Sequence, residues 1–130
     1  MVDTGHSITF SGSEHEIVLD VRHFVYLITQ MFEVRQTEIF ASWLGGLTDI
    51  RAIARVDIRI RRLSLGNMGD AKSLGEGLSE MRIDYGPGYR LYFTRRGERI
   101  VILLCGGDKK RQSTDIVRAR QLLKDLDDDS

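Results

Sequence analysis

The chain has 130 residues, the length of one domain, and its nineteen Lys and Arg side chains balance nineteen Asp and Glu. A hydrophobic fraction of 42% and a charged fraction of 29% are ordinary for a globular protein and exclude collagen-like, disordered and membrane-embedded classes. The single cysteine, Cys105, excludes an internal disulfide, and the first thirty residues lack the pattern of a signal peptide. We therefore expect a cytoplasmic protein.

The balanced charge is the sum of three unlike segments. Residues 1–30 carry a net charge of −3 and residues 125–130 a net charge of −4, whereas residues 31–124 carry eighteen basic and eleven acidic side chains, a net charge of +7. Such an asymmetry indicates an anionic partner for the central segment, or it serves only solubility. Charge by itself leaves both interpretations open.

Residues 1–30 also differ from the rest in composition. All three histidines precede Met31, and the first half of this segment is polar and has no sustained hydrophobic period. We interpret residues 1–30 as an N-terminal extension, with Met31 as an alternative start, followed by a domain over residues 31–130 that ends in an acidic tail at 125–130. The alternative is an extra element that folds onto the domain.

The first part of this domain predicts one strand and two helices. Alternation over Met31–Gln36 is typical of a short strand. The hydroxyl of Thr37 is suited to cap a helix that the Gly45–Gly46 pair ends. Thr48 or Asp49 then caps a second, arginine-rich helix. We expect the two helices to form a hairpin that packs on one face of a sheet.

Beyond Gly66–Asp70 the hydrophobic period changes from 3.6 to two residues, which indicates strands. The run Ile100–Cys105 is apolar throughout and predicts a strand buried on both faces. Ser113 or Thr114 is expected to cap a final helix. The fold class is therefore α+β, a small antiparallel sheet with a helical hairpin and a C-terminal helix. The expected strands of the sheet are Ala71–Leu74, Glu80–Tyr85, Tyr89–Thr94 and Ile100–Cys105.

The sequence lacks the motifs that metal-dependent and nucleotide-binding chemistries require. No Cys/His cluster has metal-ligand spacing, no histidine follows Met31, and there is no phosphate-binding P-loop. Cys105 ends an apolar strand, so we expect it to be buried and not to be a nucleophile. We expect neither a metal ion nor a cofactor.

Basic side chains on the sheet are the main candidates for binding. Alternation puts Arg82, Arg90 and Tyr92 on the face opposite Leu91 and Phe93, and we expect this face to be uncovered. Arginine forks match phosphate oxygens and tyrosines stack on bases, so the face fits single-stranded RNA. The alternative is a solvated face on which Glu80 and Asp84 pair with Arg82. Side chains expected to complete the RNA surface are Tyr85, Lys109, Lys110 and Arg111.

The second predicted helix carries a stripe of arginines beside its apolar line. Such a stripe is either a solvated face or a docking surface for an acidic partner segment or for ribosomal RNA. Its members are Arg51, Arg55, Arg59 and Arg62.

Two motifs carry a family resemblance, E-x-R-I-D-Y-G-P-G-Y-R-L-Y-F beginning at Glu80 and L-L-C-G-G-D-K beginning at Leu103. With the run FEVRQTEIFASWLGGL they resemble the phage-derived addiction module killer proteins of the RelE/ParE toxin superfamily, which includes HigB-like toxins. The resemblance extends from Met31 to about Lys124.

The resemblance implies the toxin of a type II toxin–antitoxin pair with a helix-turn-helix antitoxin as its partner. RelE-type relatives cleave mRNA on the ribosome without a metal. By position, Arg90 corresponds to the family arginine that faces the scissile phosphate, and Arg82 falls near a strand lysine of the best-known members. Lys109 and Lys110 stand where the family has another cation before the last helix. Lys72 joins Tyr85, Tyr92 and Arg111 as an expected RNA contact.

The chain also departs from the family pattern. Glu80 stands where a strand lysine is common, and no tyrosine or histidine follows Asp115 in the last helix. We expect a ribosome-dependent mRNA endoribonuclease, with a toxin–antitoxin hetero-oligomer as its stored form. The alternatives are a ParE-like inhibitor of DNA gyrase that cleaves nothing and a catalytically degenerate co-repressor.

Overall fold

The computed structural model describes residues 7–10, 17–23, 25 and 31–129, and the chain divides into two compact units, Met1–Met31 and Phe32–Ser130. In the first unit, β1 (Ser7–Phe10) and β2 (Ile17–Asp20) pair in antiparallel fashion. Much of residues 1–30 lies outside the described residues, and the interpretation of this segment as an extension stays a prediction.

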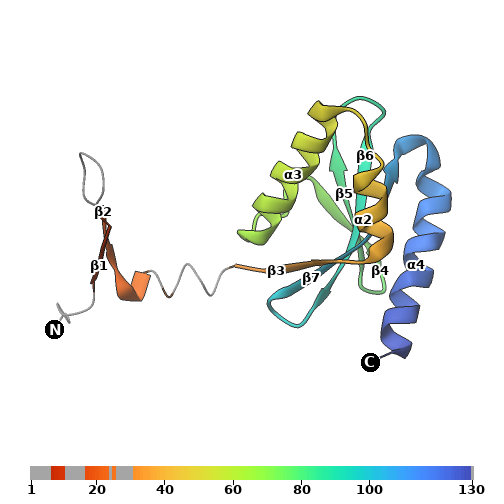
Figure 1. Ribbon diagram of the computed structural model, residues 1–130. Coiled ribbons are helices and arrows are strands. Elements are labelled where there is room, and N and C mark those ends of the chain that lie inside the picture. Colours follow the sequence, from red (N-terminus) through yellow and green to blue (C-terminus); the bar gives the residue numbers. More distant parts are fainter. Residues whose placement is uncertain (1–6, 11–16, 24, 26–30, 130) are drawn as a thin grey trace. The chain divides into compact units, whose positions relative to one another are not determined.

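The second unit contains one five-stranded sheet of order β3-β7-β6-β5-β4 (Figure 1). Strand β3 runs parallel to β7, and all other neighbours are antiparallel. The expected fully antiparallel sheet is therefore wrong, because side-chain alternation does not report the direction of a neighbouring strand. The elements are β3 (Glu33–Gln36), α2 (Glu38–Gly45), α3 (Ile50–Ser64), β4 (Ala71–Gly75), β5 (Leu78–Ile83), β6 (Tyr89–Arg96), β7 (Ile100–Asp108), the 3-10 turn η1 (Lys109–Arg111) and α4 (Gln112–Asp128).

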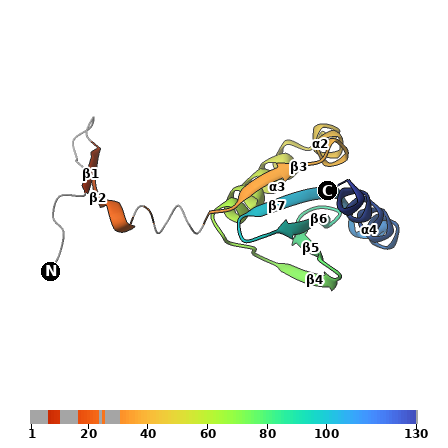
Figure 2. The ribbon, with the colours of Figure 1, turned by 90° about the horizontal axis from the view of Figure 1, so that it is seen from below.

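Helices cover both faces of this sheet. One core, on the face of α3, joins Val56 and Leu63 to Leu91 and Phe93. The other joins residues of α4 to Tyr92 and its sheet neighbours, and Figure 2 shows α3 and α4 on opposite sides of the sheet. The expectation of an uncovered face is therefore wrong. Alternation along β6 predicted that Arg90 and Tyr92 lie on a solvated face, but α4 packs on that face.

Local hydrogen bonds explain where the first two helices begin. Thr37 Oγ1 accepts a bond from Phe40 N (3.0 Å) and donates one to Leu104 O (2.6 Å), so the cap also fastens α2 to β7. Asp49 caps α3 in the same manner. Within α2, Phe40 packs in the α3-side core and Ile39 in the α4-side core. A helical hairpin packed as one unit on one face is therefore not confirmed.

Both ends of α4 differ from the expectation. Asp108 Oδ1 accepts a bond from Arg111 N (3.0 Å) and starts η1, so α4 begins at Gln112 and neither Ser113 nor Thr114 caps it. At the other end α4 continues to Asp128, so most of the expected acidic tail is helical. An ion pair between Arg96 and Asp127 holds this end to β6.

Two adjacent glycines of β7 allow side chains to lie directly on the strand. A Cβ added at Gly106 would overlap the ring of Trp43, and one added at Gly107 would overlap the carboxylate of Asp115. Because successive residues of a strand face opposite sides, the pair admits α2 on one face and α4 on the other.

We predict that Gly106→Ala destabilises the protein by about 1–3 kcal/mol, because the new methyl group must displace the Trp43 ring from a packed contact. Urea unfolding measures the change. Gly45→Ala is the matched control: nothing lies within 4 Å of its added Cβ, so its stability should equal or exceed that of the wild type. Equal stabilities of the two variants would contradict the close approach at Gly106.

Candidate functional site

The expected basic residues gather at one end of the sheet. Arg82, Arg90 and Gly107 form a cross-strand row on the α4-facing side, and Lys72 pairs with Glu80 in the next row. Turn η1 follows β7 directly, and Lys109 packs beside Gly88, just before β6. We call this surface the basic strip; it comprises Lys72, Arg82, Arg90, Lys109, Lys110 and Arg111.

Arg90 is the unusual member of the strip. It is 9% exposed, its Nε is buried without a partner, and no side chain among the described residues hydrogen-bonds its guanidinium. Buried polar groups in folded proteins are nearly always hydrogen-bonded. A nearly buried guanidinium with an unmet Nε donor is therefore a candidate site for an anion, and phosphate is the anion whose geometry matches the arginine fork.

A buried carboxylate lies beside Arg82, the neighbour of Arg90 in the cross-strand row. Glu80 is fully buried; its Oε1 lies 3.5 Å from Arg82 Nε, and its Oε2 accepts a bond from Gln112 Nε2 (2.8 Å). The alternative in which Glu80 pairs with Arg82 is thus present, but inside the protein and not on a solvated face. The side chain of Arg82 is still 38% exposed. The hydrogen bond from Gln112 to Glu80 links β5 to the start of α4.

The two tyrosines expected to stack on bases have other positions. Tyr92 is completely buried beneath α4, so its assignment as an RNA contact is wrong. Burial, with a smaller effect of Glu80, raises the pKa of Tyr92 far above its usual value and prevents it from acting as a base. Tyr85 lies in the loop after β5, where its hydroxyl donates to Asp49 Oδ2 (3.0 Å) and the Arg55 guanidinium lies 4.6 Å from its ring centroid. The hydrogen bond to Asp49 raises the pKa of Tyr85.

Only some arginines of the stripe on α3 are exposed and without hydrogen bonds to the rest of the protein. Arg51 and Arg62 are exposed, whereas Arg59 donates to the backbone oxygens of Arg82 (2.6 Å) and Met68 (3.3 Å). Arg59 thus holds the chain after α3 against β5, and burial lowers its pKa, whereas its expected part in partner binding stays a prediction. Two exposed apolar side chains of the same helix region, Ile58 and Leu65, accompany the remaining arginines.

Sequence reasoning missed Asp115 as a functional candidate. This residue of the first turns of α4 is 9% exposed, and its Oδ2 is buried without a partner above Gly107. Burial raises the pKa of Asp115; Asp108 adds to the effect, while Arg111 and Arg118 oppose it. Gly107 is the one signal in the sequence, because a strand glycine often marks the close approach of another group.

Cys105 is buried as expected, at 1% exposed, with its Sγ 3.9 Å from Asp115 O. Burial raises the pKa of this thiol to about 12. The thiolate, which is the reactive form, is therefore not populated at neutral pH.

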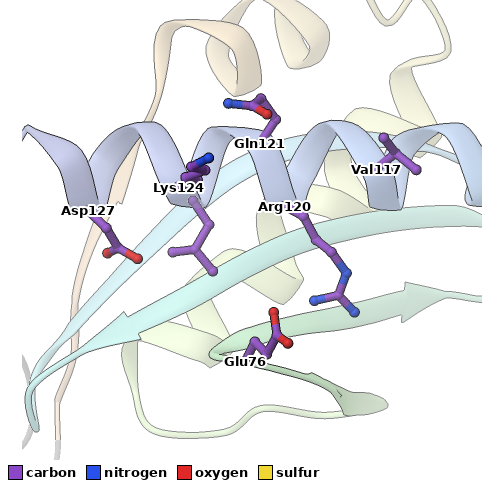
Figure 3. A pocket seen from close by; sticks show the side chains of 7 residues that line it. Glu76, Val117, Arg120, Gln121, Lys124 and Asp127 are labelled. Carbon is purple, nitrogen blue, oxygen red and sulfur yellow. The ribbon is translucent and has the colours of Figure 1, made fainter.

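A hollow of about 570 Å³ lies between α4 and the turn that joins β4 to β5. Figure 3 shows Arg120 reaching from α4 toward Glu76 in this turn. Its guanidinium donates to Leu74 O (2.8 Å) and Gly75 O (3.3 Å). These two hydrogen bonds join α4 to the end of β4, and Lys124 is the other cation that lines the hollow.

Over residues 7–10, 17–23, 25 and 31–129, no group of three or more His, Cys, Asp or Glu side chains is arranged to hold a metal ion. Within the same residues, no helix is long and apolar enough to cross a membrane.

Fold and site together define a small α+β protein with the basic strip at one end of a mixed sheet. Residues 47–124 match the family model described as phage-derived protein Gp49-like (DUF891). An uncharacterized protein of Haemophilus influenzae is 47% identical over 94 residues, which cover 72% of this chain and 95% of that protein. No solved structure matches the chain. The chain belongs to the Gp49-like family, which is associated with toxin–antitoxin addiction modules.

We predict that Cys105 does not react with a thiol reagent such as dithionitrobenzoate in the native protein and reacts fully in denaturant, because its thiol is both buried and protonated. Absorbance of the released thiolate measures the reaction. Rapid modification of the folded protein would contradict the buried position.

We predict that Asp115→Asn stabilises the protein more at neutral pH than at acid pH. The pKa of Asp115 is raised above 3.8 in the folded state, so protonation of Asp115 stabilises the folded protein. This stabilisation is complete below pH 3.8 and is lost as the pH rises through the raised pKa. Urea unfolding over a pH series measures the difference between variant and wild type. Asp128→Asn removes an exposed carboxylate from the same helix and serves as the control. A pH-independent difference at Asp115 would refute this effect.

Proposed function

We propose that this protein is the toxin of a type II toxin–antitoxin pair and acts as a metal-independent, ribosome-dependent mRNA endoribonuclease. Membership of the Gp49-like family supports the toxin class. The observation that carries the nuclease proposal is Arg90, a nearly buried guanidinium with an unmet Nε donor that pairs across the strands with Arg82. Likeness to the RelE/ParE superfamily in the two sequence motifs supports the same activity.

In the proposed reaction a ribose 2′-hydroxyl attacks the adjacent phosphorus. The bond from O2′ to phosphorus forms while the bond from phosphorus to O5′ breaks, and the proton of the hydroxyl passes to an acceptor. Arg90 stabilises the negative charge of the five-coordinate phosphorane, and Arg82 positions the RNA backbone. Lys109 or Lys110 neutralises the leaving oxygen or donates a proton to it.

From Met31 onward, neither a histidine nor Tyr92 offers a general base. No histidine follows Met31, and Tyr92 is buried with a raised pKa. Arginine stays protonated and does not accept the proton. In-line positioning and charge stabilisation by the strip therefore supply most of the rate, with water or ribosomal RNA as the proton acceptor. This division of labour accounts for dependence on the ribosome.

We assign antitoxin binding to the exposed face of α3. Arg51, Arg55 and Arg62 supply positive charge there, and Ile58 and Leu65 supply exposed apolar area. An acidic, amphipathic segment of a helix-turn-helix antitoxin fits this combination. The resulting hetero-oligomer would hold the toxin inactive.

One observation favours a different function. Glu80 lies beside Arg82 in the protein interior and reduces the positive charge of the strip, which suits a degenerate toxin that serves only as a co-repressor. A ParE-like gyrase inhibitor is the third candidate; the exposed arginine and apolar side chains of α3 fit a protein target of that kind.

We predict that Arg90→Ala abolishes growth arrest on induction and lowers mRNA cleavage by about 100- to 1,000-fold. Arg90→Lys keeps the charge without the bidentate fork and should recover only part of the activity. Sequencing of mRNA 5′ ends after induction measures cleavage, and circular dichroism of each purified variant verifies folding.

Arg99→Gln is the matched control, because it removes an exposed arginine at the opposite end of β7. The same cultures are assayed for plasmid supercoiling. Codon-phased cuts support the nuclease; altered supercoiling without cuts identifies gyrase inhibition, and neither effect identifies a co-repressor. Full growth arrest by a folded Arg90→Ala protein would refute the assigned site.

A further inference from the structure

The end of β5 lacks a complete strand partner at Arg82, just beyond the start of β4. Strand β4 pairs with β5 from Ala71, opposite Met81, and before it Asp70 O accepts a hydrogen bond from Arg82 N (2.8 Å). A regular antiparallel pair of this type would exchange a second bond, to the carbonyl oxygen of Arg82. Among the described residues, the donor to this oxygen is instead Arg59 Nη1, at 2.6 Å. A side chain of α3 therefore completes the sheet at Arg82.

Arg59 occupies a position of α3 that faces the sheet. Ala52, Val56 and Leu63 are fully buried, and Arg59 falls on the same line of the helix, at intervals of three and four residues. A cation on a core-facing line is unfavourable unless specific contacts or a function require it. Burial lowers the pKa of Arg59, which the charge of Asp70 opposes. An arginine at this position indicates that its contacts serve more than packing.

The loop between α3 and β4 is shaped around the same guanidinium. Arg59 Nη2 donates to Met68 O (3.3 Å), and a Cβ added at Gly69 would overlap the guanidinium. Gly69 has a φ of +62°, a conformation that glycine adopts without strain. The planar arginine fork thus holds two carbonyl oxygens of separate segments in one fixed geometry, whereas a lysine would offer a single flexible point charge.

This clamp lies where two cations are forced together. Arg82 and Arg90 are directly opposite each other on β5 and β6. Because the N–H and C=O of Arg82 point away from β6, this pair exchanges no hydrogen bonds, and opposite side chains approach most closely in pairs of that type. Like charges directly opposite each other destabilise a sheet, and Glu80 Oε1, 3.5 Å from Arg82 Nε, offsets part of the repulsion. The end of β5 therefore needs a restraint at its outer edge.

We infer that Arg59 is a positioning residue of the basic strip. It holds the backbone of Arg82 at the outer edge of β5, so that the guanidinium of Arg82 stays beside that of Arg90 and both converge on one RNA phosphate. The inference rests on the proposed function, in which these two arginines contact the RNA backbone, and it deepens that function. Arg59 acts through Arg82 and touches no substrate.

The alternative is that Arg59 only closes the loop between α3 and β4. In that case its loss would lower the stability of the whole protein, and any effect on RNA would be the same whether or not the side chain of Arg82 is present. A positioning role requires that side chain, because without it there is nothing to orient. Combined substitutions at the two residues separate the two roles.

Amide hydrogen exchange tests the restraint without any nucleic acid. We predict that Arg59→Ala accelerates exchange of the Arg82 amide about tenfold, because the strand edge opens locally, and leaves the amides of β7 unchanged. Arg59→Lys keeps the charge without the fork and should have a smaller effect. Arg61→Ala is the matched control, since it removes an exposed arginine of the same helix that pairs with Asp57 (3.0 Å). Unchanged exchange at Arg82 in a folded Arg59→Ala protein would refute the restraint.

A double-mutant cycle on a short single-stranded RNA oligonucleotide tests the role in binding. Fluorescence anisotropy of the full-length protein measures affinity, and Arg61→Ala gives the effect of removing one positive charge from α3. Relative to that control, Arg82→Ala and Arg59→Ala should each weaken binding about tenfold, and the double variant should bind no more weakly than Arg82→Ala alone. Arg59→Lys should recover part of the loss, and circular dichroism verifies folding. Additive losses would overturn the inference.

Mapping of mRNA 5′ ends separates this inference from the nuclease proposal. If Arg59→Ala lowers the number of cuts but adds nothing to the effect of Arg82→Ala, both proposals stand. If the wild type cleaves nothing and the RNA-binding losses are still non-additive, only the nuclease proposal is wrong. If Arg90→Ala abolishes cleavage whereas Arg59→Ala exchanges and binds RNA like Arg61→Ala, only the role of Arg59 is wrong.

Discussion

The structure depends on the burial of β7 on both of its faces. This strand pairs with β3 on one side and β6 on the other, while α2 and α4 pack against it. Its apolar first part supplies residues to both cores, and its final glycines let Trp43 and Asp115 lie on the backbone. Because helices must cover both faces, the basic side chains can gather only at the end of the sheet, where the helices begin.

The interior of this end is unusually polar. Glu80, Arg90, Tyr92 and Asp115 are all buried or nearly so, and each has a buried atom without a hydrogen-bond partner. Elsewhere among the described residues, Thr94 is the one other buried polar side chain. Unmet buried polar groups are rare in folded proteins and concentrate at functional sites, and their concentration beneath the start of α4 is the reason that we propose this end of the sheet as the functional one. The Gly66–Asp70 loop and the α4–Glu76 junction lack this feature.

Much of the fold was predictable from local patterns. Thr37 and Asp49 cap their helices as expected, and the alternation of Met81 and Ile83 placed them in the core. Errors arose wherever a distant element decides the environment. Tyr92 follows the pattern of a solvated residue, yet α4 covers it; Arg59 follows that of an exposed stripe, yet two backbone oxygens of neighbouring segments bind it.

By itself, the sequence determined the order of strands and helices, the basic centre of the chain and the motifs that link it to its family, because periodicity, capping and composition act within a few residues. Only the tertiary structure decided which face is covered, that β3 runs parallel to β7, and that Asp115 lies above Gly107 without a donor. Those properties depend on contacts between segments far apart in the chain. The burial of Asp115 raises its pKa and leaves its Oδ2 without a donor. The only local sign of this burial in the sequence is Gly107, whose missing side chain makes space for the carboxylate.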